Sequence, residues 1–253
     1  MEEHSFWIAE QANRLLGTVI LPYKTAFLTM VYGWVNMTYT PAEKVIPDHV
    51  VFALLLFLFS AIFFPLMRRS FSMEKPGKIQ QILELSLEFL NAQMEEIIGH
   101  GGKRYLPLVA TLGIFILLMN MIGLVPGFLS PTSNINVTVG CALTVFLYYN
   151  FLGIKKHGIL KYLKHFAGPI WWLAPLMFPI EIISHLARPF SLSVRLFANI
   201  FGEDLIILVF FSLVPFILPL PIMGLAIFTS FLQAFIFMVL TMIYVQGAIG
   251  EEH

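Results

Sequence analysis

The sequence predicts an all-α, polytopic membrane protein with about five membrane helices, an amphipathic surface helix, and a long tilted or membrane-embedded helical pair in its C-terminal half. Three observations lead to this fold class. Of the 253 residues, 58% are hydrophobic and only 12% are charged, about half the charge of an ordinary soluble domain. The mean hydropathy is +0.83. Several runs without Asp, Glu, Lys or Arg are long enough to cross a bilayer, which takes about 20 residues. We therefore expect a single membrane domain over residues 1–253.

The charge balance and the cysteine content exclude other classes. Fifteen basic and fifteen acidic residues cancel, so the sequence offers no basic surface for nucleic acid. The only cysteine, Cys141, cannot form an internal disulfide. No nucleophile–base set, metal cluster or phosphate-binding loop is evident, so we expect no catalytic residues, no metal and no cofactor. The N-terminus opens with MEEHSFW, which lacks the basic start of a cleavable signal peptide.

The N-terminal segment, residues 1–49, is expected on the outer side of the membrane. Its apolar part, Leu15–Val35, is interrupted by Pro22, Lys24 and Gly33. These interruptions favour a segment that lies in the membrane interface. The alternative is a sixth span, which would place the N-terminus inside.

Charge-free runs mark the expected membrane spans. The first is Val50–Met67, and Tyr105–Ile154 is long enough for two more. Residues 125–134 (VPGFLSPTSN) divide that pair, because Pro, Gly, Ser and Asn together favour a turn. Leu205–Gly250 is again free of charge, with a break predicted at residues 213–221.

The orientation follows from the Lys and Arg residues of short loops, which concentrate on the cytoplasmic side. Two loops carry them: Arg68, Arg69, Lys75 and Lys78 after the first span, and Lys155, Lys156, Lys161 and Lys164 after the third. Both loops should be cytoplasmic. Residues 127–134 should then lie outside, and the C-terminus should be cytoplasmic.

Residues 76–99 predict an amphipathic helix, with Pro76 near its start and Gly99 at its end. The expected apolar face consists of Ile79, Ile82, Leu83, Leu90, Met94, Ile97 and Ile98, while Gln80, Glu84, Glu88 and Glu95 fall largely elsewhere. We interpret this segment as a helix on the cytoplasmic membrane surface. The alternative is a helix that packs on neighbouring helices, because the pattern does not identify the apolar partner.

Residues 166–204 are mostly apolar but include several charged side chains. Glu181, Arg188 and Arg195 are spaced by seven residues, so in a helix they drift only about 20° per step. The polar side of such a helix carries Glu181, Ser184, His185, Arg188, Ser191, Arg195, Asn199 and Glu203, and the apolar side carries Ile182, Ile183, Leu186, Phe190, Val194, Phe197 and Phe201. Pro189 should kink the helix, because it removes a backbone hydrogen bond.

This polar side cannot face lipid, because a charge at mid-bilayer costs at least about 2.5–3.5 kcal/mol. It must face protein or water, and it indicates an ion or proton path. Two structural alternatives remain for Arg195. Its side chain could reach a lipid headgroup, or it could pair with Glu181 or Glu203 as a packing device.

Four motifs resemble subunit a of the F-type ATP synthase. They are PIEIISHLARPFSLSVRLFANIFGEDL around Arg195, LLMNMIGLVP at 117–126, INVTVGCAL at 135–143, and FLQAFIFMVLTMIYVQGAIGEEH at 231–253. The resemblance covers the chain from about Val50 to its end. Residues 1–49 match the family only loosely.

The resemblance implies a non-catalytic stator subunit in the bacterial inner (plasma) membrane. Its implied partners are the rotor-ring subunit c, the peripheral-stalk subunit b, the lipid bilayer and protons, and residues 166–250 would face the ring. Each rotor carboxyl would ionise opposite Arg195, because a nearby cation lowers a carboxyl pKa by about 1–3 units. Arginine cannot release its own proton, so it would separate two offset half-channels. Each charge that crosses supplies about 2.3 kcal/mol per 100 mV.

The roles implied for individual residues follow the matched motifs. Arg195 is the separator, Gln233 should hydrogen-bond near it, and Asn199 and Asn120 should line a half-channel. Glu181, Glu203 and Asp204 are candidate proton relays, and His185 is either a relay or a satisfied structural group. Many relatives have a histidine where this chain has Ala226, and this chain fits the version with two adjacent acids instead. Glu203 lies about 80° from Arg195 around the helix and Asp204 about 180°, which favours Glu203.

Two rival classes fit less well. A secondary transporter would show repeats with broken helices in matching halves, and no such pairing is evident. An ion channel would need a multimeric filter or a charged ring. The choice between H⁺ and Na⁺ stays open, because it resides mainly in the rotor subunit.

Overall fold

The structure of the protein is a computed structural model. It describes residues 10, 11, 13, 47–69, 71, 72, 76–99, 101–125, 128, 130–158, 162, 174–213 and 219–250. The apolar segment Leu15–Val35, expected in the interface or as a sixth span, lies outside these residues. Residues 166–173 and most of the loop 155–165 lie outside them as well.

Five helices of the described chain are long and apolar enough to cross a membrane. They are α2 (Asp48–Arg68), α4 (Leu106–Ile122), α5 (Ile135–His157), α7 (Ala174–Leu213) and α8 (Pro219–Ile249). Two short 3₁₀ turns, η1 (Gly102–Tyr105) and η2 (Pro131–Ser133), precede α4 and α5. The predicted all-α, polytopic class is confirmed, and η2 falls within the turn predicted at residues 125–134.

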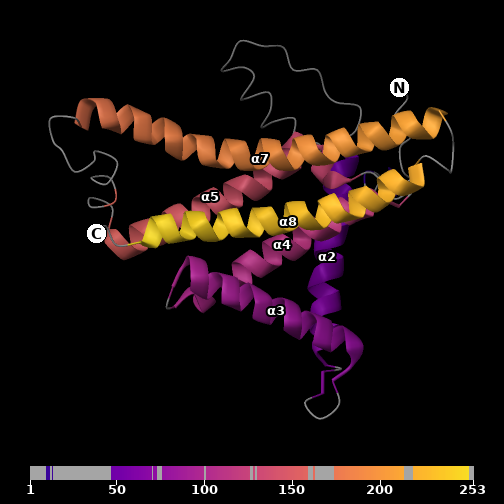
Figure 1. Ribbon diagram of the computed structural model, residues 1–253, viewed down its shortest axis with the longest axis horizontal. Coiled ribbons are helices and arrows are strands. Elements are labelled where there is room, and N and C mark those ends of the chain that lie inside the picture. Colours follow the sequence, from indigo (N-terminus) through magenta and orange to yellow (C-terminus); the bar gives the residue numbers. More distant parts are fainter. Residues whose placement is uncertain are drawn as a thin grey trace.

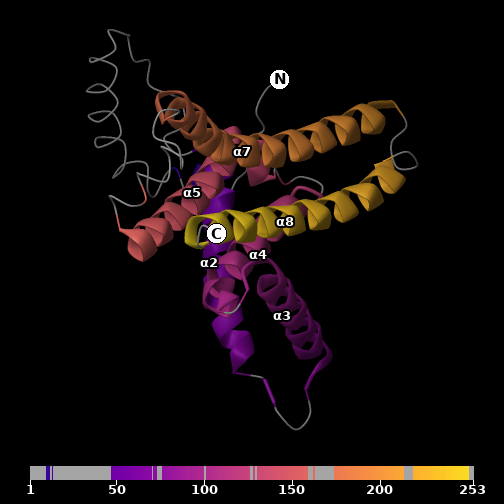
Figure 2. The ribbon, with the colours of Figure 1, turned by 60° about the vertical axis from the view of Figure 1, so that its left-hand side comes forward.

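The two C-terminal helices are longer than a membrane crossing requires. α7 has 40 residues, which is about 60 Å, whereas the hydrocarbon core is about 30 Å thick. Figures 1 and 2 show α7 and α8 side by side and running across the direction of α2. If α2 follows the membrane normal, α7 and α8 are steeply tilted. α7 continues through Pro179 and Pro189, and it bends near its middle (Figure 2).

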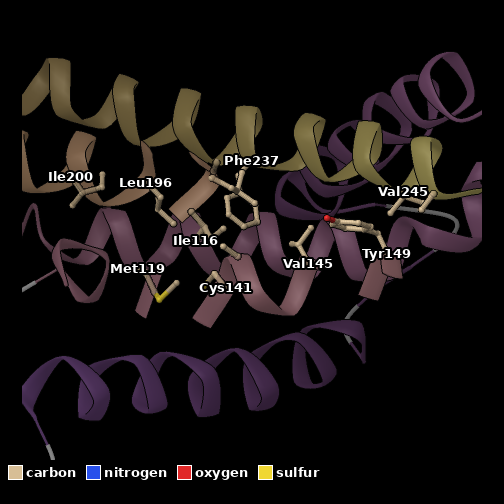
Figure 3. Close-up of a cluster of buried hydrophobic side chains, with 13 residues drawn as sticks. Ile116, Met119, Cys141, Val145, Tyr149, Leu196, Ile200, Phe237 and Val245 are labelled. Carbon is tan, nitrogen blue, oxygen red and sulfur yellow. The ribbon is translucent and has the colours of Figure 1, made fainter. Parts of the chain in front are cut away.

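A buried apolar cluster joins α4, α5, α7 and α8 (Figure 3). Ile116, Tyr149, Leu196 and Phe237 are at most 1% exposed and supply one side chain from each of these helices. The end of α8 is held separately, because Lys156 Nζ donates a 2.6 Å hydrogen bond to the carbonyl oxygen of Ile249. The core therefore fixes α7 and α8 against the two shorter helices.

The amphipathic helix α3 (Lys78–Ile97) forms where predicted, and Gly99 follows it with a left-handed φ of 85°, a conformation common after helix ends. Its predicted faces need correction. Leu90 and Met94 pack on α4 and α8, whereas Ile79 and Ile82 are exposed, together with Leu85 and Phe89. Gln80, expected on the polar side, is buried, because its amide hydrogen-bonds the backbone of Ser72 in both directions, each at 3.1 Å. α3 thus packs on protein along one strip and leaves a second apolar strip uncovered.

Candidate proton-translocation site

α7 and α8 run antiparallel, and their polar side chains meet in a ladder. Asn199 Nδ2 donates a 2.7 Å hydrogen bond to Gln233 Oε1. One turn further along α7, the hydroxyl of Thr229 donates to Glu203 Oε2 at 2.7 Å. Residues later in α7 therefore pair with residues earlier in α8. The ladder sets which residues of α8 lie level with Arg195 and with the two acids.

Arg195 lies on the exposed side of α7. Its neighbours Leu192 and Leu196 are buried against the rest of the chain, while Arg195 points away from them and its side chain is exposed. Within the described residues its guanidinium forms no ion pair with Glu181 or Glu203, so the packing-device alternative finds no support there. The charge faces outward from the protein itself.

The surface beside Arg195 consists of small residues. Successive turns of α7 expose Ser184, Ala187, Ser191 and Ala198, and Gly202, whose neighbourhood has room for a Cβ atom, follows them. Small side chains allow another helix to approach closely within a membrane. The bulky residues Phe190 and Phe201 are exposed on a different side of the helix. The arginine therefore stands at the edge of a surface suited to close helix contact.

Gln233 pairs with Asn199 rather than with Arg195. Its side chain is buried, and its Nε2 has no hydrogen-bond partner among the described residues. Asn199 follows Arg195 by four residues, about one turn or 6 Å along the helix. The sequence analysis expects a hydrogen bond of Gln233 near Arg195. In the structure the partner of Gln233 is Asn199, and its Nε2 is left without a partner among the described residues.

The two adjacent acids face different neighbours. Glu203 is half-buried and turns toward Thr229 on α8. Asp204 is also half-buried and faces the side chain of Ser133 at the end of η2. The structure thus separates them as their 100° angular difference requires, and each could serve a different part of a proton path.

Asn120 joins the same end of the site from α4. It is buried, and its Oδ1 accepts a 2.7 Å hydrogen bond from Thr132 of η2. Ser130 lies beside Thr132, with 2.8 Å between the two hydroxyl oxygens. Because η2 contacts both α4 and α7 and its Ser133 faces Asp204, this polar group connects Asn120 with Asp204. Its amide Nδ2 has no partner among the described residues.

His185 belongs to a separate polar cluster, ten residues or about 15 Å from Arg195 along α7. Its Nε2 lies 2.9 Å from Asn150 Oδ1 on α5, which also accepts a 2.9 Å bond from the hydroxyl of Tyr162. The imidazole packs against the ring of Tyr149. This geometry favours the structural alternative for His185. Glu181 lies one turn before it and is half-buried.

The sequence analysis missed three polar residues that contact the candidate residues: Thr132, Thr229 and Asn150. For Thr229 a signal existed, because it lies four residues before Gln233 in an otherwise apolar run and so shares its side of a helix. For Thr132 there was none, because its contact with Asn120 depends on how the turn folds back. Asn150 could have been noticed as an amide deep within a charge-free span.

Comparisons with known proteins agree on one family. The family profile described as ATP synthase A chain matches residues 49–246. The ATP synthase subunit a of Geobacter sulfurreducens is 53% identical over 178 residues, which cover 70% of this chain and 77% of that protein. A subunit a (numbered 1) of Pelobacter propionicus is 48% identical over 206 residues, covering 81% and 89%. The subunit a of Solibacter usitatus is 47% identical over 213 residues, covering 84% and 91%.

Proposed function

The chain belongs to the ATP synthase A chain family, and on that premise we propose that Arg195 and the polar side chains around it couple proton movement to rotation. Its function is that of the proton-translocating stator subunit in the membrane sector of the F-type complex. The single observation that carries the proposed role of Arg195 is its exposure: the guanidinium points outward and forms no ion pair within the described chain.

The partner that meets this charge is the carboxyl group of a rotor-ring subunit c. A carboxylate in lipid is costly, so the group crosses the lipid in its protonated form. Opposite Arg195 the cation favours the ionised form and the proton leaves. The small residues Ser191, Ala198 and Gly202 support this arrangement, because they let a rotor helix come close to α7.

Two offset half-channels would deliver and remove the proton. Asn120, Glu203 and Asp204 line the path from the outer side, and Glu181 lies toward the cytoplasmic path. Arg195 stands between them and repels any proton that would cross directly. A proton then crosses only by riding on the ring, and each charge supplies about 2.3 kcal/mol per 100 mV to the rotation. The subunit itself catalyses no bond chemistry.

The remaining parts of the chain take supporting roles in this proposal. The protein is a multi-pass protein of the bacterial cell membrane, with its C-terminus in the cytoplasm. Residues 166–250 form the ring-facing part of a single membrane domain, and residues 1–49 lie on the outer side. α3 rests on the cytoplasmic surface, where its exposed residues Ile82, Leu85 and Phe89 meet lipid or the peripheral-stalk subunit b.

The test is ATP-driven proton pumping by membrane vesicles that carry the assembled complex. In Arg195→Ala, coupled pumping should stop, because no group compels the rotor carboxyl to release its proton. Passive proton leak should persist or rise. Assembly is checked by retention of the rotor ring. Near-normal coupled pumping by assembled Arg195→Ala complexes would overturn the proposed role.

A further inference from the structure

The turn that joins α2 to α3 brings together three exposed cations. Arg68 is the last residue of α2, Arg69 follows it, and Lys78 is the first residue of α3. All three side chains are exposed, and none of them forms an ion pair with a described residue. The loop sequence between them adds Glu74 and Lys75, whose charges cancel. The α2–α3 corner, defined as residues 66–82, therefore carries three uncompensated cations.

A buried glutamine holds this corner together. Gln80 is 8% exposed. Its Oε1 accepts a hydrogen bond from the backbone N–H of Ser72, and its Nε2 donates to the carbonyl oxygen of Ser72, each at 3.1 Å. Ser72 follows Arg69 by three residues and Gln80 follows Lys78 by two, so this contact fixes the end of α2 beside the first turn of α3. The corner lies at the end of the molecule away from α7 (Figure 1).

Apolar side chains are exposed around the same corner. Leu66 of α2, Phe71 of the turn, and Ile79 and Ile82 of α3 are each at least 41% exposed. Leu66 continues the exposed apolar surface of α2, which is one of the candidate membrane spans and meets lipid along its length. The uncovered strip of α3 therefore extends the lipid-facing surface of α2 around the turn.

The acidic residues of α3 lie on another side of the helix. Four exposed residues fall within about 60° of one another at 100° per residue: Lys78, Ile82, Leu85 and Phe89. Glu84, Glu88 and Glu95 lie about 90–130° from the centre of that strip. Glu96 shares the angle of the strip, but it is about 27 Å from the first residue of α3 along the helix. The strip thus joins apolar side chains to a cation at the end nearest α2.

We propose that the α2–α3 corner binds an anionic phospholipid of the cytoplasmic leaflet. Arg68, Arg69 and Lys78 hold the phosphate of its headgroup, the strip of α3 covers its acyl chains, and Gln80 keeps the cations together. Two observations select lipid over a protein partner: the strip is continuous with the lipid-facing side of α2, and cations at a membrane surface attract anionic lipids. The inference rests on the position of α3 at the cytoplasmic surface in the proposed function.

The first experiment compares two lipid probes that differ only in their headgroup. The assembled complex is placed in phosphatidylcholine vesicles that contain a trace of phosphatidylglycerol or phosphatidylcholine with the same photoreactive acyl chain. After irradiation, adducts on residues 62–89 are counted by mass spectrometry of chymotryptic peptides, because chymotrypsin does not cleave at Lys or Arg. The phosphatidylglycerol probe should label this segment at least about fivefold more, since one cation near the surface favours anionic lipid by about that factor.

Neutralising the corner should remove this preference. In the triple variant Arg68→Gln, Arg69→Gln, Lys78→Gln, the ratio of phosphatidylglycerol to phosphatidylcholine adducts should fall close to one, while labelling by phosphatidylcholine persists. A control variant replaces three other cations by Gln: Lys103, Arg104 and Lys155. The control should keep the wild-type ratio, and assembly of both variants is checked by retention of the rotor ring. A corner variant that keeps the wild-type ratio overturns the proposal.

Gln80→Ala tests the contact that holds the cations together. All three cations remain in this variant, but Ser72 loses both bonds to the glutamine, so the adduct ratio should fall at least twofold. Gln93→Ala is the matched control on the same helix, because the Gln93 amide contacts Glu96 of α3 itself. A wild-type ratio in Gln80→Ala would overturn the role given to this glutamine.

The labelling also decides between occupants. If a protein of the assembled complex covers the strip, residues 78–89 will carry no adduct from either probe, and the proposal is wrong. Equal labelling by both probes would show a purely apolar surface and would overturn it as well.

The outcome separates this inference from the proposed role of Arg195. If Arg195→Ala abolishes coupled pumping while both probes label the corner equally, the lipid site is wrong and the role of Arg195 stands. If Arg195→Ala pumps normally while the phosphatidylglycerol preference is found, the role of Arg195 is wrong and the lipid site stands.

Discussion

The polar residues around His185, in the first half of α7, and those around Arg195, in the second half, differ in their contacts. In the first half, His185 contacts Asn150 at 2.9 Å, and Arg188 lies over the ring of Tyr244, 5.8 Å from its centre. In the second half, Arg195 is exposed without an ion pair in the described chain. Across from this half, Gln233 and Ser230 of α8 each keep a buried atom without a partner.

This difference in contacts distinguishes polar residues that stabilise the structure from polar residues that act on the rotor ring. A buried polar group without a hydrogen bond destabilises a protein by about 1–3 kcal/mol, and such groups persist mainly at functional sites. A group that already has two protein partners is poorly suited to exchange protons or to release a ligand. We therefore assign structure to the cluster around His185 and Arg188 in the first half of α7, and ion movement to the residues around Arg195 in the second half.

The largest expected effect comes from a conservative change at the centre of the second half. Arg195→Lys keeps the charge but replaces a planar, five-donor group with a compact ammonium that can lose its proton when dehydrated. Coupled proton pumping should fall below about a tenth of the wild-type rate. Pumping in vesicles, normalised to the retained rotor ring, measures this. A variant that pumps at more than half the wild-type rate would show that charge alone is sufficient.

The next effect concerns the two acids. Glu203→Gln combined with Asp204→Asn should nearly abolish pumping, because no carboxylate remains on the outer path of α7. Glu203→Gln alone should be more severe than Asp204→Asn, because Glu203 lies about 80° from Arg195 and Asp204 about 180°. Full pumping by the double variant would remove both residues from the mechanism.

A second substitution that restores pumping would test the role of Glu203 further. Thr229 lies within 2.7 Å of Glu203 Oε2 and 3.1 Å of the Ala226 carbonyl oxygen, so positions 203 and 226 are neighbours across the α7–α8 contact. Ala226 is buried, and Glu203→Gly opens space beside it. Ala226→His in that background should restore part of the pumping. The single variant Ala226→His, which lacks this space, is the control.

A smaller effect on transport, and a clear effect on stability, is expected in the first half. Asn150→Ala leaves the Tyr162 hydroxyl and His185 Nε2 without their shared acceptor, which should cost about 1–3 kcal/mol. The temperature at which the complex loses its rotor ring should fall. Pumping below that temperature should stay within about twofold of wild type, because distant sites act independently.

The control for Asn150→Ala is Thr144→Ala on the same helix, where an exposed hydroxyl bonds only its own helix. Both transport and stability should stay unchanged in this variant. If Asn150→Ala instead stops pumping in complexes of normal stability, the cluster around His185 also moves protons, and its structural assignment is wrong.

The smallest effect is at the end of α8. Lys156→Ala removes the bond to the Ile249 carbonyl oxygen, and a cation at a helix C-terminus contributes about 0.3–1 kcal/mol. Hydrogen exchange of the last backbone amides of α8 should become faster, while pumping stays unchanged. Lys155→Ala is the control, because the ammonium of Lys155 lies over the Phe151 ring of its own helix at 6.0 Å.

The positions of the helices could be predicted from the sequence, whereas the contacts between them could not. Charge-free runs located α2, α4, α5 and α8, because length and hydropathy are properties of a single segment. Periodicity placed Arg195 and Asn199 on one side of α7 for the same reason. The bond between Asn199 and Gln233 required the register of two helices, which depends on side-chain packing far away in the sequence.

The errors have the same origin. Gln80 was expected among the polar residues of α3, yet a return of the chain at Ser72 covers it. Met94 was assigned to the same apolar face as Ile79, but only Met94 found a protein neighbour. A helical pattern shows which residues share a side, whereas the identity of the covering element follows from the fold.

The contact between α4 and α8 also constrains the order in which the helices of this protein can assemble. α4 ends at Ile122 and α8 begins only at Pro219, so until α8 is synthesised Gly113 and Asn120 have no α8 to pack against. Transmembrane helices associate after insertion through close packing and hydrogen bonds, so this amide faces lipid or a temporary companion in the nascent chain. The contact between α4 and α8 forms when Met238 packs against Gly113. Until α8 is synthesised, the side of α4 that carries Gly113 and Asn120 therefore lacks the helix that covers it in the finished structure.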